Sequence, residues 1–154
     1  QLQLLLLLQK PLLQLLKPDA VHRNLIGRIM ARVEEAGFTV RAASLQKMER
    51  ADAEEFYAVH RERPFFPALV EYMTSGPIFV TVLEHENAVQ HLRDVIGATD
   101  PVEAAPGTIR RDFGLSKQAN SCHGSDSPEN GQIEIAYWLR RGILMTPEKA
   151  ATAS

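Results

Sequence analysis

Apolar positions along the chain follow two different spacings, and the spacing separates strands from helices. A continuous apolar run that is rich in β-branched residues and suits a buried strand occupies 78–83, and the leucine-rich segment 12–16 can serve as another strand. A loosely alternating segment at 38–45 and a short one near 119–123 add two more strands. The pattern therefore predicts four strands, and the last of them ends at His123.

Apolar residues that recur every three or four positions predict the helices. Over 24–36 and 87–96 such residues share one face, with charged residues opposite. Gly37 follows the first of these helices and suits a left-handed cap. A closing helix is predicted over 127–139, because Ser127 is a favoured N-cap residue and a proline follows it at the first helical position.

Polar and proline-rich segments separate the remaining elements. Lys17–Asp19 indicates a turn, because proline biases its predecessor away from helix. Asp52–Glu55 resembles a capping box that opens a helix, and Arg63–Pro67 breaks that helix before a short one over 68–74. Residues 97–119 show little periodicity and predict a long loop, which in a compact domain tends to be functional.

The order of these elements predicts one α+β domain. Strands and helices alternate as β-α-β-β-α-β, with extra helices and no internal repeat. This order is typical of a ferredoxin-like sandwich, in which helices cover a four-stranded antiparallel sheet. We expect the domain to span 12–140, since no linker divides it and 154 residues suit a single core. Residues 1–11 are then a low-complexity leucine-rich leader, and 141–154 a frayed tail.

Composition limits the compartment and the partners. Residues 1–16 hold ten leucines but no basic segment or small-residue cleavage site, which argues against a signal peptide. The run is also shorter than the about 20 apolar residues of a spanning helix. Cys122 is the single cysteine, so no intrachain disulfide can form and a reducing, cytoplasmic location is expected. A formal net charge of −2 gives no general reason to expect nucleic-acid or anionic-membrane binding.

Two possible uses of the cysteine and the histidines carry little weight. Cys122 beside His123 suggests a Cys-His nucleophile, but adjacent strand residues point to opposite faces, which favours a buried filler role for the thiol. Four other histidines show no metal-ligand spacing with one another or with the cysteine, and we interpret them as surface or supporting residues: His22, His60, His85 and His91.

One polar segment carries the strongest chemical signal. It reads NSCHGSDS over 120–127 and is followed by Glu134. The glycine after His123 lets the backbone bend or approach a ligand closely, and the serine and aspartate residues supply local hydrogen bonds. A neutral imidazole is a good nucleophile near neutral pH. The segment therefore predicts an imidazole in a tight polar turn, although a lone histidine in a sequence is more often structural or solvated than catalytic.

This segment resembles the active-site signature of nucleoside diphosphate kinases, which read Asn-x-x-His-Gly-Ser-Asp-Ser and then Glu-Ile a helix later. Four further segments resemble that family in the same order: KPDAVHR at 17–23, FYAVHRERPFFPALVEYMTSGP at 56–77, HLRDVIGATDP at 91–101 and PGTIRRDF at 106–113. The resemblance extends over roughly four fifths of the chain. It implies the same α+β fold and a phosphotransferase activity.

The resemblance implies a phosphohistidine mechanism. His123 takes the γ-phosphoryl group of a nucleoside triphosphate, typically ATP, and passes it to a nucleoside diphosphate in ping-pong fashion. Glu134 orients the imidazole with Ser125 beside it, and Tyr57 lies close to the transferring phosphate. Magnesium is expected to arrive on the nucleotide phosphates and not in a protein metal site, because the sequence offers no carboxylate cluster suited to hold it.

Side chains are expected to hold the phosphates, since the sequence contains no glycine-rich loop of the G-x-x-x-x-G-K-[ST] kind. By the resemblance, Arg93 and Arg110 grip the terminal phosphates, where a planar guanidinium can bond two oxygens at once. Thr99 adds a hydroxyl contact. Lys17 and Asn120 hydrogen-bond the ribose and the neighbouring phosphate oxygens.

The resemblance also implies a base site that tolerates different nucleotides. Phe65 stacks on the base with Leu69 beside it, and stacking accepts purines and pyrimidines alike because every base has a π-face. Phe66 is expected to pack in the core instead. One departure from the family pattern is Gly131, which should weaken the last helix by about 1 kcal/mol relative to alanine and could loosen Glu134.

The family forms tetramers or hexamers, so a homo-oligomer is expected. An alternative hypothesis is a catalytically inactive relative that acts as a nucleotide-binding or protein-interaction scaffold. The intact histidine motif argues against that alternative, because a scaffold has no need of the nucleophile.

Overall fold

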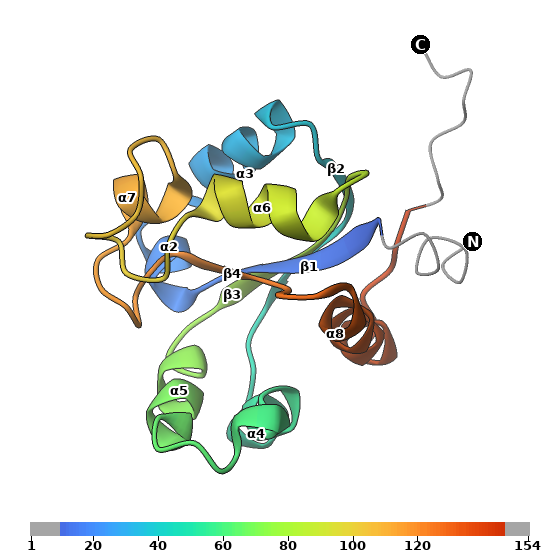
Figure 1. Ribbon diagram of the computed structural model, residues 1–154. Coiled ribbons are helices and arrows are strands. Elements are labelled where there is room, and N and C mark those ends of the chain that lie inside the picture. The colour runs from blue at the N-terminus through green and yellow to red at the C-terminus, as the bar shows by residue number, and fades with distance from the viewer. Residues whose placement is uncertain (1–9, 147–154) are drawn as a thin grey trace.

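The centre of the molecule is a four-stranded antiparallel sheet. A computed structural model describes residues 10–146, and within that range the strands lie in the spatial order β2-β3-β1-β4. Their bounds are Pro11–Leu16 for β1, Thr39–Gln46 for β2, Ile78–Glu84 for β3 and Cys122–Gly124 for β4. Helices cover both faces of this sheet (Figure 1). The predicted ferredoxin-like α+β fold is thereby confirmed.

The helices divide between the two faces of the sheet. One face carries α3 (Ile26–Glu35) and α6 (Ala88–Ile96), and the other carries α8 (Pro128–Arg140) (Figure 1). A lobe below the same face as α8 consists of α4 (Arg50–Phe56), the 3₁₀ turn η1 (Ala58–His60) and α5 (Phe66–Met73). Two short helices, α2 (Pro18–His22) and α7 (Ile109–Phe113), lie at one end of the sheet.

Strand β1 is buried along its whole length because it pairs with β3 on one side and β4 on the other. Its leucines alternate between two cores, one under the α4–α5 lobe and α8 and the other under α3 and α6. Opposite Leu15 and Leu16 in the register stand His123 and Cys122. Cys122 therefore belongs to the α3–α6 core, where burial raises the pKa of its thiol to about 12. Its interpretation as a buried filler residue is confirmed.

Three local predictions need correction. The turn predicted at Lys17–Asp19 is instead the start of α2: Lys17 is extended, as expected before proline, and Pro18 occupies the favoured first helical position. Helix α4 begins at Arg50 and not at Asp52, whose carboxylate accepts a hydrogen bond from the Glu49 backbone N–H at 2.9 Å. The predicted loop over 97–119 contains helix α7, which is too short to show a helical period.

Two predicted helix ends are confirmed. Gly37 ends α3 in the left-handed region, with φ at +97°. Ser127 caps α8, since its hydroxyl accepts a hydrogen bond from the Asn130 backbone N–H at 3.1 Å, and Pro128 follows at the first helical position.

The first residues after α8 are anchored. Ile143 is buried in the core next to α8. The Thr146 backbone N–H donates to the Arg41 carbonyl at 2.7 Å, and the Arg41 guanidinium donates to the Thr146 carbonyl. The part of the predicted frayed tail that the structure describes is therefore held against β2. The predicted leader lies almost wholly outside the described residues, and over 10–146 no helix has the length and apolarity that crossing a membrane requires.

Replacing Gly131 with alanine should stabilise the protein. Gly131 lies inside α8, and an added Cβ would meet the Ser125 side chain at 3.5 Å, which is ordinary van der Waals contact. We expect the free energy of unfolding to rise by about 0.5–1 kcal/mol and the melting temperature by roughly 1–4 °C. Thermal denaturation measures both.

Gly142→Ala is the matched control for this prediction. An added Cβ at Gly142 would meet nothing within 4 Å, but its φ of +98° strains any other residue, so this variant should melt lower than the wild type. A Gly131→Ala protein that also melts lower would show that α8 has no room for the methyl group.

Candidate functional site

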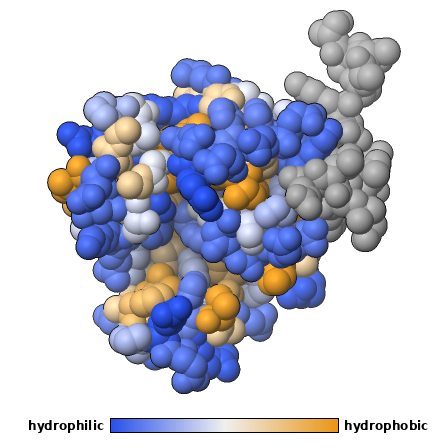
Figure 2. Space-filling view, in the orientation of Figure 1, coloured by the Kyte–Doolittle hydropathy of each residue, from blue (hydrophilic) through white to orange (hydrophobic). Residues whose placement is uncertain are grey.

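A cavity of about 380 Å³ opens beside β4, next to α6. Figure 2 shows the same face of the molecule as largely hydrophilic, with a hollow between the upper part and the lobe of α4 and α5. Segments far apart in the sequence supply the polar lining of the 380 Å³ cavity: Arg93, Thr99, Arg110, His123, Ser125 and Asp126. The cavity therefore gathers five of the side chains that sequence reasoning selected, together with Asp126.

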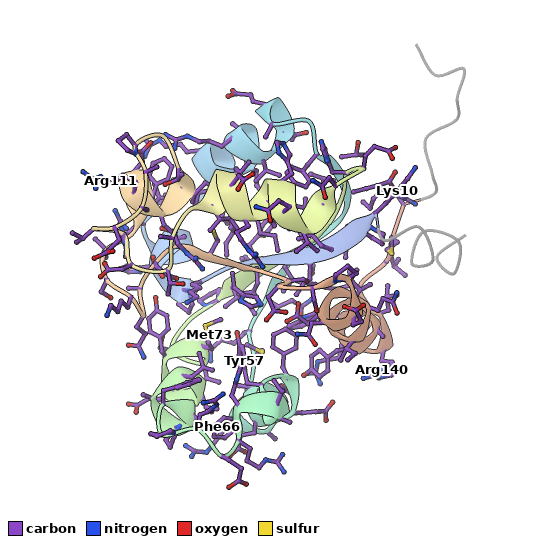
Figure 3. The ribbon with its side chains drawn as sticks, viewed as in Figure 1. Lys10, Tyr57, Phe66, Met73, Arg111 and Arg140 are labelled. Atoms are coloured by element: carbon purple, nitrogen blue, oxygen red, sulfur yellow. The ribbon has the colours of Figure 1, made fainter. Side chains whose placement is uncertain are left out.

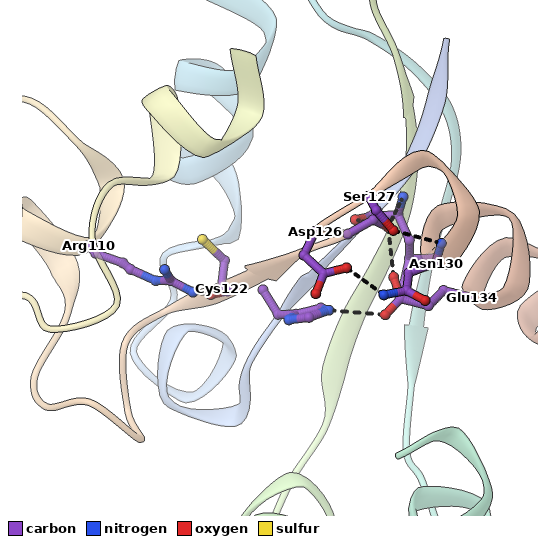
Figure 4. A network of polar contacts seen from close by, with 9 residues as sticks. Arg110, Cys122, Asp126, Ser127, Asn130 and Glu134 are labelled. Atoms are coloured by element: carbon purple, nitrogen blue, oxygen red, sulfur yellow. Dashed lines mark hydrogen bonds and ion pairs between the residues drawn. The ribbon is translucent and has the colours of Figure 1, made fainter. Parts of the chain in front are cut away.

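His123 is held from one side by Glu134. The imidazole Nε2 lies 3.2 Å from Glu134 Oε2, and the side chains are 31% and 19% exposed. The other carboxylate oxygen of Glu134 accepts a hydrogen bond from the Ser125 hydroxyl at 2.7 Å (Figure 4). Because α8 carries Glu134 and β4 carries His123, the contact joins two elements across the edge of the sheet.

Ser125 connects this pair to the central strand. Its backbone N–H donates to the Leu13 carbonyl at 3.0 Å, and its hydroxyl accepts from the Leu13 N–H at 3.1 Å. Ser125 is 5% exposed, so these bonds are shielded from water. The chain of contacts from β1 through Ser125 and Glu134 fixes the orientation of the imidazole before any ligand binds.

Arg110 reaches the cavity from α7. Its two terminal nitrogens donate to the Gly97 carbonyl at 3.1 Å and to the Cys122 carbonyl at 2.9 Å, and its Nε is buried without a partner among the described residues. Burial lowers the pKa of Arg110, but a guanidinium keeps its proton in proteins. A positive charge is thus fixed next to the backbone of β4, one residue from His123.

Arg93 and Thr99 line another part of the cavity wall, in and after α6. Both are exposed, and the Arg93 guanidinium donates to the Asp126 carbonyl at 3.2 Å. The Asp126 carboxylate is occupied by the side-chain amide of Asn130 at 2.6 Å (Figure 4). The wall therefore presents one guanidinium and one hydroxyl to the cavity.

Lys17 lies outside the cavity lining but close to Arg110. Its ammonium donates to the Gln118 carbonyl at 3.2 Å. Burial, and after it the charge of Arg110, lowers the pKa of Lys17 to about 8. An anion bound next to Lys17 would raise this pKa again and stabilise the protonated lysine, so the environment favours anion binding.

Tyr57, Phe65 and Leu69 belong to the α4–α5 lobe and do not line the cavity. Tyr57 lies on the side of the lobe that faces the sheet (Figure 3), and burial together with the Glu134 charge raises the pKa of its hydroxyl. Phe65 is 49% exposed and Leu69 is partly buried, whereas Phe66 packs in the core. The predicted core packing of Phe66 is confirmed, and base stacking by Phe65 stays a prediction.

Asn120 is almost wholly buried, with 1% of its surface exposed. Its amide donates to the Thr99 carbonyl at 2.9 Å, and its Oδ1 has no partner among the described residues. Asn120 thus ties the loop after α6 to the segment before β4, and it keeps one acceptor free.

Sequence reasoning missed Gly97. Its carbonyl accepts from Arg110, its φ is +92°, and an added Cβ would lie 2.5 Å from the Thr108 hydroxyl. A glycine directly after a predicted helix was the available signal, because such positions often need the left-handed region.

The described residues contain no group of three or more His, Cys, Asp or Glu side chains that could hold a metal ion. Charge at this site comes from the arginines and the lysine instead. Two guanidinium groups in the lining of the same cavity as an oriented imidazole suit a ligand with several negative charges and a group that can be transferred to nitrogen.

Comparison with known proteins agrees with this chemistry. A family model described as nucleoside diphosphate kinase matches residues 11–143. The chain is 61% identical to a nucleoside diphosphate kinase of Bordetella avium over 127 residues, which are 82% of this chain and 90% of that protein. It is 58% identical to a nucleoside diphosphate kinase of Wolinella succinogenes over the same length, covering 93% of that protein.

Solved structures show the same likeness. The crystal structure of the Aquifex aeolicus nucleoside diphosphate kinase superposes with a TM-score of 0.82 at 45% identity, over 84% of this chain and 94% of that one. The apo enzyme from Encephalitozoon cuniculi superposes with a TM-score of 0.81 at 39% identity, over 84% of this chain and 88% of that one.

Proposed function

Because the chain belongs to the nucleoside diphosphate kinase family and has that activity, we propose that His123 carries the phosphoryl group between the two nucleotides. In the first half-reaction a bond forms between an imidazole nitrogen and the γ-phosphorus, and the bond from that phosphorus to the bridging oxygen breaks. A nucleoside diphosphate leaves. A second diphosphate then takes the group from the phosphohistidine by the reverse steps.

The contact with Glu134 supports Nδ1 as the attacking nitrogen. A carboxylate only accepts, so Nε2, which lies 3.2 Å from it, carries the ring proton. In the neutral ring the lone pair is then on Nδ1. This oriented imidazole, at the wall of a cavity that also holds two guanidinium groups, is the single observation that carries the proposal.

The cationic side chains provide charge stabilisation. Phosphoryl transfer needs positioning and electrostatic stabilisation more than covalent chemistry. We assign Arg110 and Arg93 to the terminal phosphates, since both line the cavity with His123, and Thr99 to a hydroxyl contact.

A magnesium ion fits this site as a companion of the nucleotide. Among the described residues that line the cavity Asp126 is the one carboxylate, and Asn130 already occupies it. Phosphate oxygens would therefore hold the ion, which prefers oxygen ligands and neutralises charge on the phosphates when bound.

We assign the rest of the nucleotide to the lobe and the segment around it. Phe65, half-exposed on the lobe, offers a ring on which any base can stack, with Leu69 beside it. The Lys17 ammonium can donate to ribose and phosphate oxygens, and we assign Asn120 to the ribose, whose hydroxyl can donate to Oδ1. Tyr57 lies close enough to Glu134 for that charge to raise the pKa of its hydroxyl, and we assign it a place near the transferring phosphate.

Incubation with γ-labelled ATP and magnesium tests the proposal. The protein should acquire an acid-labile, alkali-stable label that peptide mapping locates at His123. A chase with an unlabelled nucleoside diphosphate should remove the label and yield the labelled triphosphate. A protein that transfers phosphate without ever carrying the label would exclude the phosphohistidine.

A homo-oligomer, tetramer or hexamer, stays a prediction that light scattering tests.

Triphosphate binding should take up a proton at Lys17. With a pKa of about 8, the free lysine is partly deprotonated at pH 8.5, and nearby phosphates raise its pKa in the complex. Affinity should therefore weaken as the pH rises above about 8. Binding of a non-hydrolysable triphosphate at pH 8.5 should take up roughly 0.5–0.8 proton per site.

Calorimetry in two buffers with different ionisation enthalpies measures this uptake. Lys17→Met should abolish it, while the control Lys47→Met should keep it, since Lys47 instead bonds the Thr74 carbonyl. Equal heats in both buffers for the wild type would contradict the assignment of Lys17.

A further inference from the structure

We propose that Asp19 and Tyr72 position His123 by holding Ser121 in a strained turn. The inference rests on the proposed role of His123. It adds two residues that contact neither the cavity nor the imidazole and that act through the backbone leading into β4.

The strain is at Ser121. Its φ is +78°, a value that residues other than glycine rarely adopt, and the Cys122 N–H bonds back to the Asn120 carbonyl at 3.0 Å. A three-residue turn with positive φ is rare and strained. Ser121 is fully buried, and its own hydroxyl has no partner among the described residues, so the serine side chain does not stabilise the turn.

Asp19 and Tyr72 supply the missing support. The Ser121 N–H donates to Asp19 Oδ2 at 3.1 Å, and the Ser121 carbonyl accepts from the Lys17 N–H at 2.9 Å. The Tyr72 hydroxyl donates to Asp19 Oδ1 and accepts from the Asp19 N–H at 3.2 Å. Asp19 is 9% exposed, so its carboxylate is shielded and well fixed. We call Asp19, Tyr72 and Ser121 the clamp.

The clamp acts on His123 through the start of β4. This strand is three residues long, lies at the edge of the sheet and, among the described residues, pairs with β1 alone. Ser121 immediately precedes it, two residues before His123. Relaxation of the turn would shift the start of β4 and with it the imidazole, and small displacements of a reacting group lower rates strongly.

Tyr72→Phe is the informative variant. Asp19 also raises the pKa of Lys17 through its charge, so replacing Asp19 would disturb a second group. Tyr72 instead lines a separate cavity of about 510 Å³ that includes Asp19 but not His123. Removing its hydroxyl should therefore leave nucleotide contacts intact and change kcat more than KM.

The experiment compares single-turnover phosphorylation of His123 by saturating magnesium-ATP in two backgrounds. Tyr72→Phe should slow the step roughly 10- to 100-fold, with KM within about twofold of the wild type. Glycine adopts positive φ without strain, so in a Ser121→Gly background the loss from Tyr72→Phe should shrink to less than about threefold. Tyr137→Phe is the matched control, because it removes a hydroxyl that bonds the Asp52 carbonyl away from the clamp.

The outcomes separate this inference from the proposed function. A wild-type protein without label on His123 overturns the proposed function itself. A labelled wild type with a Tyr72→Phe rate within about twofold of it overturns the clamp alone. An equal loss in both backgrounds does so too, because it indicates a general structural role. Should Tyr72→Phe fail to fold in thermal scans, Asp19→Asn in the same two backgrounds decides in its place. Its effect on Lys17 is common to both backgrounds, so the difference between the two losses reports the clamp alone.

Discussion

The rate of phosphoryl transfer by His123→Ala is expected to be roughly 10⁴-fold or more below that of the wild type, since the variant has no imidazole nitrogen to bond the transferred phosphorus. The fold should survive. The imidazole is about one-third exposed, and its polar contact is with Glu134, which keeps the Ser125 hydroxyl as a partner. Loss of one partly exposed hydrogen bond should lower the free energy of unfolding by about 1 kcal/mol. The melting temperature should then fall by roughly 2–4 °C.

Coupled nucleotide assays and thermal scans on the same preparation measure both quantities. His22→Ala is the control, because this histidine is exposed and lies outside the cavity lining. It should transfer and melt like the wild type. Acid-labile label that persists on His123→Ala would place the phosphoryl group on another residue and would remove the basis of the proposed mechanism.

The sheet and its two cores could be predicted because the apolar pattern is strong where burial is complete. Strand β1 lies between two neighbours, and its leucines point to both faces of the sheet, with Gln14 as the one polar residue among them. Strand β3 is next to it and follows the same rule. Helix α7 escaped prediction because five residues with one buried side chain carry no periodic signal.

The cavity residues could be selected by their resemblance to a family, but not by spacing. Arg93, Arg110 and His123 are spread over thirty positions and meet because α6 packs against both β4 and α7. No local rule in the sequence brings these elements together. Gly97 was missed for a related reason, since its importance comes from Thr108 and Arg110, which pack against it.

The contacts of the clamp could not be predicted from the sequence. Asp19 and Ser121 are 102 residues apart, and Tyr72 lies 53 residues from Asp19. A serine in a tight polar segment gives no sign of positive φ, because the strain depends on a carboxylate supplied by another element. Such features become visible only when the hydrogen bonds of the folded chain are traced.

Arg110→Ala should slow transfer by roughly 10²- to 10³-fold, the usual effect of removing one donor that stabilises charge in the transition state. It should also destabilise the protein, since the guanidinium bonds two carbonyls of the cavity wall. The loss of two hydrogen bonds predicts about 1–2 kcal/mol and a melting temperature lower by roughly 2–8 °C. Activity and stability therefore have to be separated by a control.

Arg111→Ala provides that control. Arg111 lies on the same helix and donates to the carbonyls of Val102 and Ala104 at 2.9 and 3.4 Å, but it projects away from the sheet (Figure 3). Its replacement should lower the melting temperature comparably and leave transfer unchanged. A parallel loss of transfer in both variants would show that rigidity of α7, and not the charge of Arg110, limits the rate.

Removal of Arg110 should also move the pH dependence of nucleotide binding. The charge of Arg110 helps to lower the pKa of Lys17, so Arg110→Ala should raise that pKa. The pH above which affinity falls should then lie higher than in the wild type, and proton uptake at pH 8.5 should decrease. Arg111→Ala should leave both unchanged. Because a purely structural loss would weaken binding at every pH alike, this shift separates an electrostatic role of Arg110 from a structural one.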